Sequence, residues 1–465
     1  MDHHVTRRLI HGLGANAYGQ FVVIIIQLAG VPILLHAWGA QIYGEWLILF
    51  AIPAYLTMTD LGFSQSAAND MTARVSRGDN QGALIVFQSL AALVYSVAAA
   101  GIVASAFLAA FFPLNRFIHF KALPIGQVRL IIWLFSVEVF MKLAEGPNNA
   151  GLRAYGDYAL SGLIYATSLL VQNVSVWLVA FFGYGPLLAA LSFSGVRFIA
   201  TPAVAVFLLN RHKFLSVGFR NAKISELRKL LRPALANIAM PLAQAFNIQG
   251  MLLVVGAVLG PVAVVTFSVL RTLSRLVLQL AWGVSHSFEP ELSVAWGRRD
   301  MALLQKLYVY ALRAGFWLAV FAGLTLYVFG NWIVRRWTHG MALMDSRLFH
   351  WLLLSSASSI LWYSGLIVLK SSNAHLRAAV LYLVISATGV GAALLLLHLT
   401  GRLADTGMAL IVIDVGMIIY VMPQASYATD LPLLSTIVRL FYVPVFSDYL
   451  FHSGRRSTKQ RDKEA

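Results

Sequence analysis

Long apolar runs, separated by short polar segments, follow one another along almost the whole chain. An α-helix needs about 20 consecutive apolar residues to cross a bilayer, and twelve stretches come close to that length or exceed it. They cover residues 12–36, 44–68, 83–111, 126–144, 159–182, 186–209, 233–258, 261–285, 307–329, 349–369, 377–398 and 403–422. The pattern predicts an all-α polytopic membrane protein with about twelve transmembrane helices.

The composition identifies lipid as the solvent of most of this chain. Hydrophobic residues make up 59% of the 465 residues and charged residues 12%, which is about half the charged fraction of an average soluble domain. Cysteine is absent, so disulfides, thiolate metal sites and cysteine catalysis are excluded. The histidines lack metal-ligand spacing, and no glycine-rich nucleotide loop is present. We therefore expect no metal, no cofactor and no direct use of ATP.

The positive charges are distributed unevenly between the two sides of the predicted spans. The formal net charge is +16, and the loops on the side of the N-terminus, counted with the span ends at Lys142 and Arg377 that adjoin them, hold 24 of the 35 lysines and arginines. The opposite loops hold six, and five arginines lie within spans. Because cytoplasmic loops are enriched in Lys and Arg, both termini are predicted to be cytoplasmic.

The richest basic segment, residues 210–232, separates the spans into two sets of six. We interpret it as a cytoplasmic linker that faces anionic headgroups, and we expect no nucleic-acid partner. The predicted organisation is an N-terminal six-helix bundle at 1–209, this linker, a C-terminal six-helix bundle at 233–422, and a cytoplasmic tail at 423–465. The tail is expected to hold an interfacial helix, because a thirteenth span would carry its basic end outside.

An internal duplication is predicted from the same organisation. Six spans return the chain to its starting side, so a duplicated unit gives two parallel-related halves. A shift of 221 residues superimposes the spans and loops of the two sets. It pairs Asn16 with Asn237, Gly39 with Gly260, Gly62 with Gly283, Ser66 with Ser287, Asp70 with Glu291, and Asp79 with Asp300. The expected fold is therefore two parallel-related six-helix bundles.

Two arginines stand one helical turn apart inside the eighth predicted span. Arg271 is about ten residues into that span, hence roughly 15 Å deep at 1.5 Å per residue, and Arg275 lies on the same face. A guanidinium at the bilayer centre costs roughly 2.5–3.5 kcal/mol even on lenient insertion scales. The pair therefore needs an anionic partner or a hydrated cavity. Arg197 lies at a similar depth in the sixth span.

A series of motifs marks the N-terminal third of the chain. Asn16 opens the first span, Pro32 follows, WGAQIYGEW covers 38–46 and DLGF covers 60–63. Asn69 with Asp70, RGD at 77–79 and, more weakly, AGLRAYGDY at 150–158 continue the series. In these residues the chain resembles the bacterial polysaccharide-biosynthesis flippases, which are transporters of lipid-linked oligosaccharides related to multidrug and toxin exporters and to the lipid II flippase. Beyond about residue 158 the resemblance is architectural only.

The resemblance implies a function. It implies a flippase, and not an enzyme, that moves a polyprenyl-(pyro)phosphate-linked oligosaccharide from the cytoplasmic to the outer leaflet of the bacterial inner membrane by alternating access. The product would serve O-antigen or exopolysaccharide synthesis. The implied partners are the lipid-linked glycan, membrane lipids, and polysaccharide polymerase and chain-length proteins. We expect the two bundles to enclose a cationic cavity.

Arginine suits such a substrate because its charge persists at any physiological pH and its planar fork can pair two phosphate oxygens. Arg271, Arg275 and Arg197 are therefore the predicted substrate contacts. The competing interpretation is structural: these arginines can instead pair with embedded acids such as Asp60 or Asp414 and lock helices together.

The fourth predicted span carries three charges on one face, because Glu138, Lys142 and Glu145 follow i, i+4, i+7 spacing. One interpretation is a self-neutralising ion-pair ladder near the cytoplasmic end. The other makes Lys142 an entry contact for the phosphate and gives a glutamate the role of proton carrier. Asp60 and Asp414 have similar alternatives, a proton or ion relay or a structural cap or salt bridge.

Two other functions stay open. A multidrug exporter of the same multidrug/oligosaccharidyl-lipid/polysaccharide exporter superfamily would take cationic drugs and favour acids in its cavity, whereas the deepest charges in the second half are arginines. A membrane glycan polymerase or glycosyltransferase usually needs a large polar loop or a paired-carboxylate metal site. The sequence has no DxD motif, so the flippase is favoured.

Overall fold

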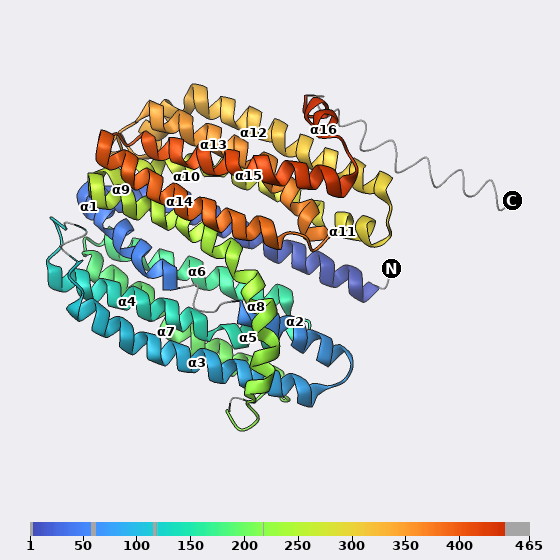
Figure 1. Cartoon of the computed structure of the whole chain (residues 1–465). Coiled ribbons are helices and arrows are strands. Elements are labelled where there is room, and N and C mark those ends of the chain that lie inside the picture. Colours follow the sequence, from blue (N-terminus) through green and yellow to red (C-terminus); the bar gives the residue numbers. More distant parts are fainter. Residues whose placement is uncertain (1–2, 57–61, 115–117, 119, 217, 442–465) are drawn as a thin grey trace. The chain divides into compact units, whose positions relative to one another are not determined.

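The computed structural model describes residues 3–56, 62–114, 118, 120–216 and 218–441, and every regular element in this part of the chain is a helix (Figure 1). The helices are α1 (His3–Ala54), α2 (Phe63–Ser76), α3 (Asn80–Phe111), α4 (Ile125–Ala144), α5 (Gly146–Ala154), α6 (Tyr158–Phe181), α7 (Pro186–Arg211), α8 (Ile224–Ala245), the π-helical turn η3 (Phe246–Gly250), α9 (Met251–Leu259), α10 (Pro261–Ser287), α11 (Glu289–Gly297), α12 (Met301–Trp337), α13 (Ser346–Ser371), α14 (Leu376–Thr400), α15 (Asp405–Thr429) and α16 (Leu433–Leu440). The predicted all-α class is confirmed.

The twelve predicted spans are found in this set of helices. Among the described residues, ten helices are long and apolar enough to cross a membrane. One of them, Gly14–Ala54, contains two successive spans, because the backbone leaves the helical region at Gly39. Helix α4 is the twelfth span. It is not among the ten because it contains three charged residues, Arg129, Glu138 and Lys142. The total agrees with the hydropathy pattern.

The prediction of one continuous helix over residues 44–68 is wrong. Helix α1 ends at Ala54, directly after Pro53, whose ring restricts the backbone and removes an N–H donor. Helix α2 begins after Gly62, which has a φ of 74°, a left-handed conformation that glycine adopts at little cost. The predicted acid Asp60 lies outside the described residues. The predicted 44–68 segment therefore consists of two helices with an interruption.

The basic linker is partly helical, because α8 begins at Ile224, inside the segment predicted as 210–232. Two ion pairs hold the first turn of α8 in place. Glu226 of α8 accepts hydrogen bonds from Arg74 of α2 at 2.5 Å and from Lys229 at 2.6 Å. The helix then runs through η3 into α9 without leaving the helical region, so the seventh predicted span is longer than its apolar core.

Backbone geometry supports the internal duplication. Gly39 and Gly260, which the 221-residue shift pairs, have φ/ψ of 69°/173° and 85°/178°, and each separates the first two spans of its half. The paired Gly62 and Gly283 behave differently, because Gly283 lies within the continuous helix α10. The interruption in the second span is thus specific to the first half.

The RGD motif is repeated with the same local structure. The carboxylates of Asp79 and Asp300 each accept a hydrogen bond from the backbone N–H three residues later, at 2.8 Å and 3.0 Å. The preceding residues, Gly78 and Arg299, both have positive φ, 80° and 55°. The RGD tripeptide therefore forms a helix-to-helix turn whose counterpart recurs in the second half.

The described chain packs as two compact units. Unit 1 comprises Met1–Val269, Trp332–Asp345 and Ser386–Thr406, and unit 2 comprises Leu270–Asn331, Ser346–Ile385 and Gly407–Ala465. These borders cross α10, α12, α14 and the first turn of α15, so each of these helices contributes to both units. The division of the chain at the basic linker stays a prediction.

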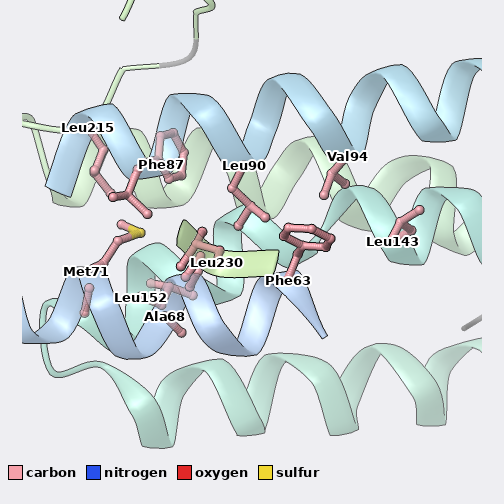
Figure 2. Packing of buried hydrophobic residues seen from close by; sticks show 14 of the residues in the cluster. Phe63, Ala68, Met71, Phe87, Leu90, Val94, Leu143, Leu152, Leu215 and Leu230 are labelled. Atoms are coloured by element: carbon pink, nitrogen blue, oxygen red, sulfur yellow. The ribbon is translucent and has the colours of Figure 1, made fainter. Parts of the chain in front are cut away.

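The core of unit 1 joins six helices, α2, α3, α4, α5, α7 and α8, with Leu208 as the member from α7. Figure 2 shows apolar side chains from α2, α3, α4, α5 and α8 in contact, with Leu215 from the segment before α8. The labelled members are Phe63, Ala68, Met71, Phe87, Leu90, Val94, Leu143, Leu152, Leu215 and Leu230. Leu143 anchors the end of α4 in this core, which positions the neighbouring Lys142 and Glu145.

The WGAQIYGEW motif also has a structural role in unit 1. Glu45 is fully buried and its carboxylate accepts hydrogen bonds from the backbone N–H groups of residues 121–123, at 2.7–3.0 Å. Gly44 packs against Pro261 so closely that an added Cβ would lie 2.1 Å from the carbonyl oxygen. The motif therefore anchors one loop and permits one close helix approach.

The core of unit 2 lies between α11, α12, α13, α15 and α16, and includes Leu292, Leu304, Ile367, Met422 and Leu440. Helix α16 has eight residues, about 12 Å of helix at 1.5 Å per residue. That length cannot cross a bilayer. The described part of the tail therefore contains one short helix, and its place at the membrane interface stays a prediction.

The two repeated glycines give a test of this fold. Their φ/ψ region is open essentially to glycine, and no heavy atom lies within 4 Å of an added Cβ at either position. We expect Gly39→Ala and Gly260→Ala each to lower the free energy of unfolding by about 1–3 kcal/mol through backbone strain, measured as a lower Tm in detergent. Gly126→Ala, with equally open surroundings in α4, should not lower Tm, because alanine favours a helical backbone. An equal loss there would contradict the prediction.

Candidate functional site

The embedded charges predicted from the sequence fall into two groups. Unit 1 contains Arg197, Glu138, Glu145 and Lys142, and unit 2 contains Arg271, Arg275 and Asp414. The remaining predicted site residue, Asp60, is outside the described residues.

Arg197 is the centre of the group in unit 1, and its side chain is 1% exposed. Its Nη1 lies 2.9 Å from both carboxylate oxygens of Glu145, and its Nε lies 3.4 Å from Oε1 of Glu138. Its Nη2 donates a hydrogen bond to Oε1 of Gln172 at 2.7 Å. One guanidinium therefore joins α7 to α4 and α6.

Two uncharged residues complete this network. Gln172, which is fully buried, donates from Nε2 to the carbonyl oxygen of Phe193 at 3.1 Å and to Glu138 at 3.3 Å. The hydroxyl of Thr201 donates to Oε1 of Glu145 at 2.9 Å. Buried charges are tolerated when their partners and hydrogen bonds are supplied in this way. The geometry corresponds to the structural-pair interpretation of Arg197, with the acids of α4 as its partners.

Lys142 does not form an ion-pair ladder with Glu138 and Glu145, because both glutamates pair with Arg197 instead. Its ammonium lies over the ring of Tyr165, 5.4 Å from the ring centroid. In the described part of the chain no carboxylate lies within 4 Å of this ammonium. The side chain instead lines a cavity in unit 1 together with Glu145 and Arg153.

The group in unit 2 is built around the arginine pair of α10. Arg271 is 8% exposed and Arg275 is half-buried. Arg271 lies within electrostatic reach of Asp414 on α15 and Tyr382 on α14, as well as of Arg275. Arg275 is influenced by Tyr382 and by Tyr363 on α13. With all three charged residues ionised, this arginine–aspartate group has a net charge of +1.

Asp414 is held by one face of α13. Its carboxylate accepts hydrogen bonds from Ser355 Oγ at 2.5 Å, Ser359 Oγ at 2.6 Å and Trp362 Nε1 at 3.0 Å. These donors follow i, i+4, i+7 spacing, the repeat of a single helix face. Sequence reasoning missed them, although that spacing of polar atoms within an apolar span was a usable signal.

Aromatic rings surround the same group. Trp362 stacks on Tyr363 with centroids 3.9 Å apart and contacts Tyr382 at 4.9 Å. Tyr363 also meets Trp282 of α10 edge-on at 6.2 Å. Trp282 follows Arg275 by seven residues, so both lie on one face of α10. The arginines therefore stand beside a cluster of indole and phenol rings.

Gln172 and Thr201 were also missed from the sequence. An amide within an apolar helix is the kind of polar residue that bonds across helices, so Gln172 was detectable as a candidate. Its partner was not, because nothing in the local pattern specifies which helix faces α6.

Known structures share this fold. No protein-family model matches the chain, and none of the curated proteins matches its sequence. An inward-facing multidrug resistance MATE family transporter of the MOP superfamily matches with a TM-score of 0.68 and 15% identity, over 92% of this chain and 94% of the other. An outward-facing transporter of the same description matches with a TM-score of 0.61 and 13% identity, over 91% of this chain and 95% of the other. The MATE multidrug transporter DinF-BH, solved as a complex, matches with a TM-score of 0.67 and 14% identity, over 92% of this chain and 97% of the other. The chain therefore has the two-lobe, twelve-helix fold of MATE transporters.

The Arg197 network predicts a large stability effect. Arg197→Gln leaves Glu138 and Glu145 buried without their guanidinium, and breaking a buried pair in this way typically costs about 3–5 kcal/mol. We expect a lower Tm in detergent and less protein in membranes. Adding Glu138→Gln and Glu145→Gln should restore part of the loss, because no uncompensated charge then stays buried.

The matched control is Arg347→Gln, which removes an exposed arginine and should leave Tm unchanged. If Arg197→Gln proves as stable as the control, the arginine is not the structural centre of unit 1.

Proposed function

We propose that the protein is an alternating-access transporter that moves a polyprenyl-(pyro)phosphate-linked oligosaccharide from the cytoplasmic to the outer leaflet of the bacterial inner membrane, for surface polysaccharide synthesis. The fold supports the transport step, since similar structures are inward-facing and outward-facing transporters. The N-terminal motifs and the buried arginine pair support the choice of substrate.

The single observation that carries this choice is the net positive charge around Arg271 and Arg275. Asp414, the carboxylate of that group, is already bonded by three donors of α13. A phosphate or pyrophosphate brings compensating negative charge, and each guanidinium can bind two of its oxygens. The neighbouring rings of Trp282 and Tyr363 offer apolar faces to sugar rings. These groups support a phosphate attached to a glycan as the substrate.

The other predicted site residues take different roles in the proposal. Arg197 positions Glu145 and does not touch the substrate, because its guanidinium is engaged by Glu145, Glu138 and Gln172. Lys142 is a contact at the entry side. Glu138, Glu145 and Asp414 are the candidates for proton or ion coupling, as embedded acids are in many transporters. Polysaccharide polymerase and chain-length proteins are the proposed downstream partners.

A multidrug exporter is the second candidate, and one specific observation favours it. The similar structures are multidrug transporters, among them DinF-BH. Against it stands the charge of the unit 2 group, which would repel a cationic drug. A deletion strain that becomes sensitive to cationic dyes while its surface polysaccharide is intact would favour the exporter.

The arginine pair provides the principal test. Each charge-assisted hydrogen bond contributes roughly 1.5–3 kcal/mol, so losing two phosphate contacts weakens binding by about 3 kcal/mol or more, roughly a hundredfold. We therefore expect Arg271→Ala with Arg275→Ala to abolish surface polysaccharide in a complemented deletion strain while the protein level is unchanged. The measurement is polysaccharide per cell alongside immunoblotted membrane protein.

The matched control is Arg335→Ala with Arg336→Ala, which removes the same charge from two exposed arginines and should retain full polysaccharide. Arginine-to-lysine changes at 271 and 275 should retain part of the activity, since they keep charge but lose the planar fork. Full activity of the double alanine variant would refute the assignment of these arginines.

The proposed orientation has its own test. The chain has no cysteine, so single cysteines can be introduced without other changes. Ser76→Cys, at the end of α2, should react with a membrane-impermeant maleimide only in opened cells, because the proposed orientation makes it cytoplasmic. Ser346→Cys, at the start of α13, should react in intact cells whose outer membrane is permeabilised. Both positions are exposed. The reverse labelling pattern would invert the topology.

A further inference from the structure

A cavity of about 300 Å³ lies within unit 1, where α2, α4, α5 and α6 meet. Its polar wall consists of Ser64, Gln65, Lys142, Glu145, Asn149 and Arg153. The ring of Tyr165 and the apolar residues Ala68, Val139, Leu143 and Ala150 complete it. Charged, amide, hydroxyl and aromatic groups thus face one space.

The cavity has a positive balance of charge. The carboxylate of Glu145 is bonded to Arg197 at 2.9 Å and to Thr201 at 2.9 Å. Arg197 also pairs with Glu138 at 3.4 Å, so the two glutamates together exceed the charge of Arg197 by one, and Lys142 and Arg153 bring the balance to +1. No carboxylate among the described residues forms an ion pair with either of these two cations. The cavity therefore favours an anion.

The two cations are held in place by uncharged groups. Arg153 donates from Nη1 to Oε1 of Gln65 at 2.6 Å, and its guanidinium lies 5.1 Å from the ring centroid of Tyr158. Lys142 lies over Tyr165. Neither contact uses up the charge, so each cation retains donors for an oxygen-rich ligand. This arrangement suits a phosphate.

The remaining wall and the volume indicate what else the ligand carries. Gln65, Asn149 and Ser64 offer donors and acceptors that match sugar hydroxyls, and Tyr165 offers a ring face. A volume of about 300 Å³ is at the lower end of the range of small-molecule sites. It accommodates one sugar with its phosphate and not a whole oligosaccharide.

We propose that this cavity is a loading site that binds the sugar-phosphate headgroup of the lipid-linked glycan on the cytoplasmic side before translocation. Lys142 and Arg153 bind the phosphate, and the amides and Tyr165 bind the first sugar. This inference rests on the proposed function for the identity of the lipid, and on the proposed orientation, which makes helix α5 with Arg153 cytoplasmic. It adds a second anion site to the arginine pair of unit 2.

The absence of cysteine from the chain makes a direct binding test possible. Ser64→Cys places one thiol in the cavity wall of the full-length protein in phosphatidylcholine nanodiscs, and the rate of maleimide labelling is measured. We expect an undecaprenyl-diphosphate-linked sugar to slow labelling about tenfold. Millimolar glucose 1-phosphate should slow it less, because it has one phosphate and no anchoring lipid. Added phosphatidylglycerol should not slow it.

Second-site variants separate the cavity from general charge. Lys142→Gln or Arg153→Gln in the Ser64→Cys chain should weaken the protection about tenfold, the change given by about 1.4 kcal/mol. The control is Lys306→Gln, which removes one charge from another lysine that lies over a tyrosine ring, at 5.6 Å from Tyr310. It should retain full protection. Tm in detergent verifies that all variants are folded.

Three outcomes overturn the loading site: no protection by the lipid-linked sugar, equal protection by phosphatidylglycerol, or unchanged protection in the Lys142→Gln and Arg153→Gln variants. Because the assay measures binding and not flipping, these outcomes leave the proposed function standing if deletion of the gene still abolishes surface polysaccharide. A deletion strain with intact polysaccharide would refute the proposed function. If protection nevertheless depends on Lys142, the cavity is a sugar-phosphate site of a protein with another function.

Discussion

Charge in a low-dielectric interior must be compensated, and this constraint determines how both polar groups are built. A buried ion is stable only when opposite charge and hydrogen bonds replace the water it has lost. In unit 1, Arg197 meets that requirement with Glu145, Glu138 and Gln172 on two other helices. In unit 2, Asp414 directs its hydrogen bonds to α13 while two arginines stand nearby. In the first group the described charges balance, Arg197 and Lys142 against Glu138 and Glu145, whereas in the second Arg271 and Arg275 against Asp414 leave +1.

The same constraint gives α4 two functions. Its glutamates point to Arg197 and fix α4 against α6 and α7, while Leu143 anchors its end in the apolar cluster of unit 1. Lys142, between them, faces the cavity. A cation exposed in this way is useful only if its backbone does not move, since precise placement of a binding group requires support by rigid neighbours. The structural arginine thus serves the proposed entry site without touching a substrate.

The sequence could predict what depends on local pattern. Apolar runs gave the spans, and the 221-residue shift found turns with matching geometry, such as Gly39 with Gly260 and Asp79 with Asp300. It missed the interruption after Ala54, because a single proline near a helix end is compatible with a kink or a stop. It also left the partners of Arg197 open. Glu145 is 52 residues away, and pairing across helices depends on which faces pack together, which spacing within one helix does not specify.

Fold and substrate are separable in this molecule. The similar structures share 13–15% of residues with this chain over more than nine-tenths of its length, so the path of the backbone is common while most side chains differ. In the proposed function, the shared backbone carries the motion between two access states, and the sign of the buried charge selects what is carried. A cationic drug needs acids that are not already paired. Here the described acids of both groups are bonded, Glu145 to Arg197 and Asp414 to α13, and the excess charge is positive. In the proposed function, an anionic headgroup supplies the negative charge that balances the unit 2 group, as a cationic drug would not.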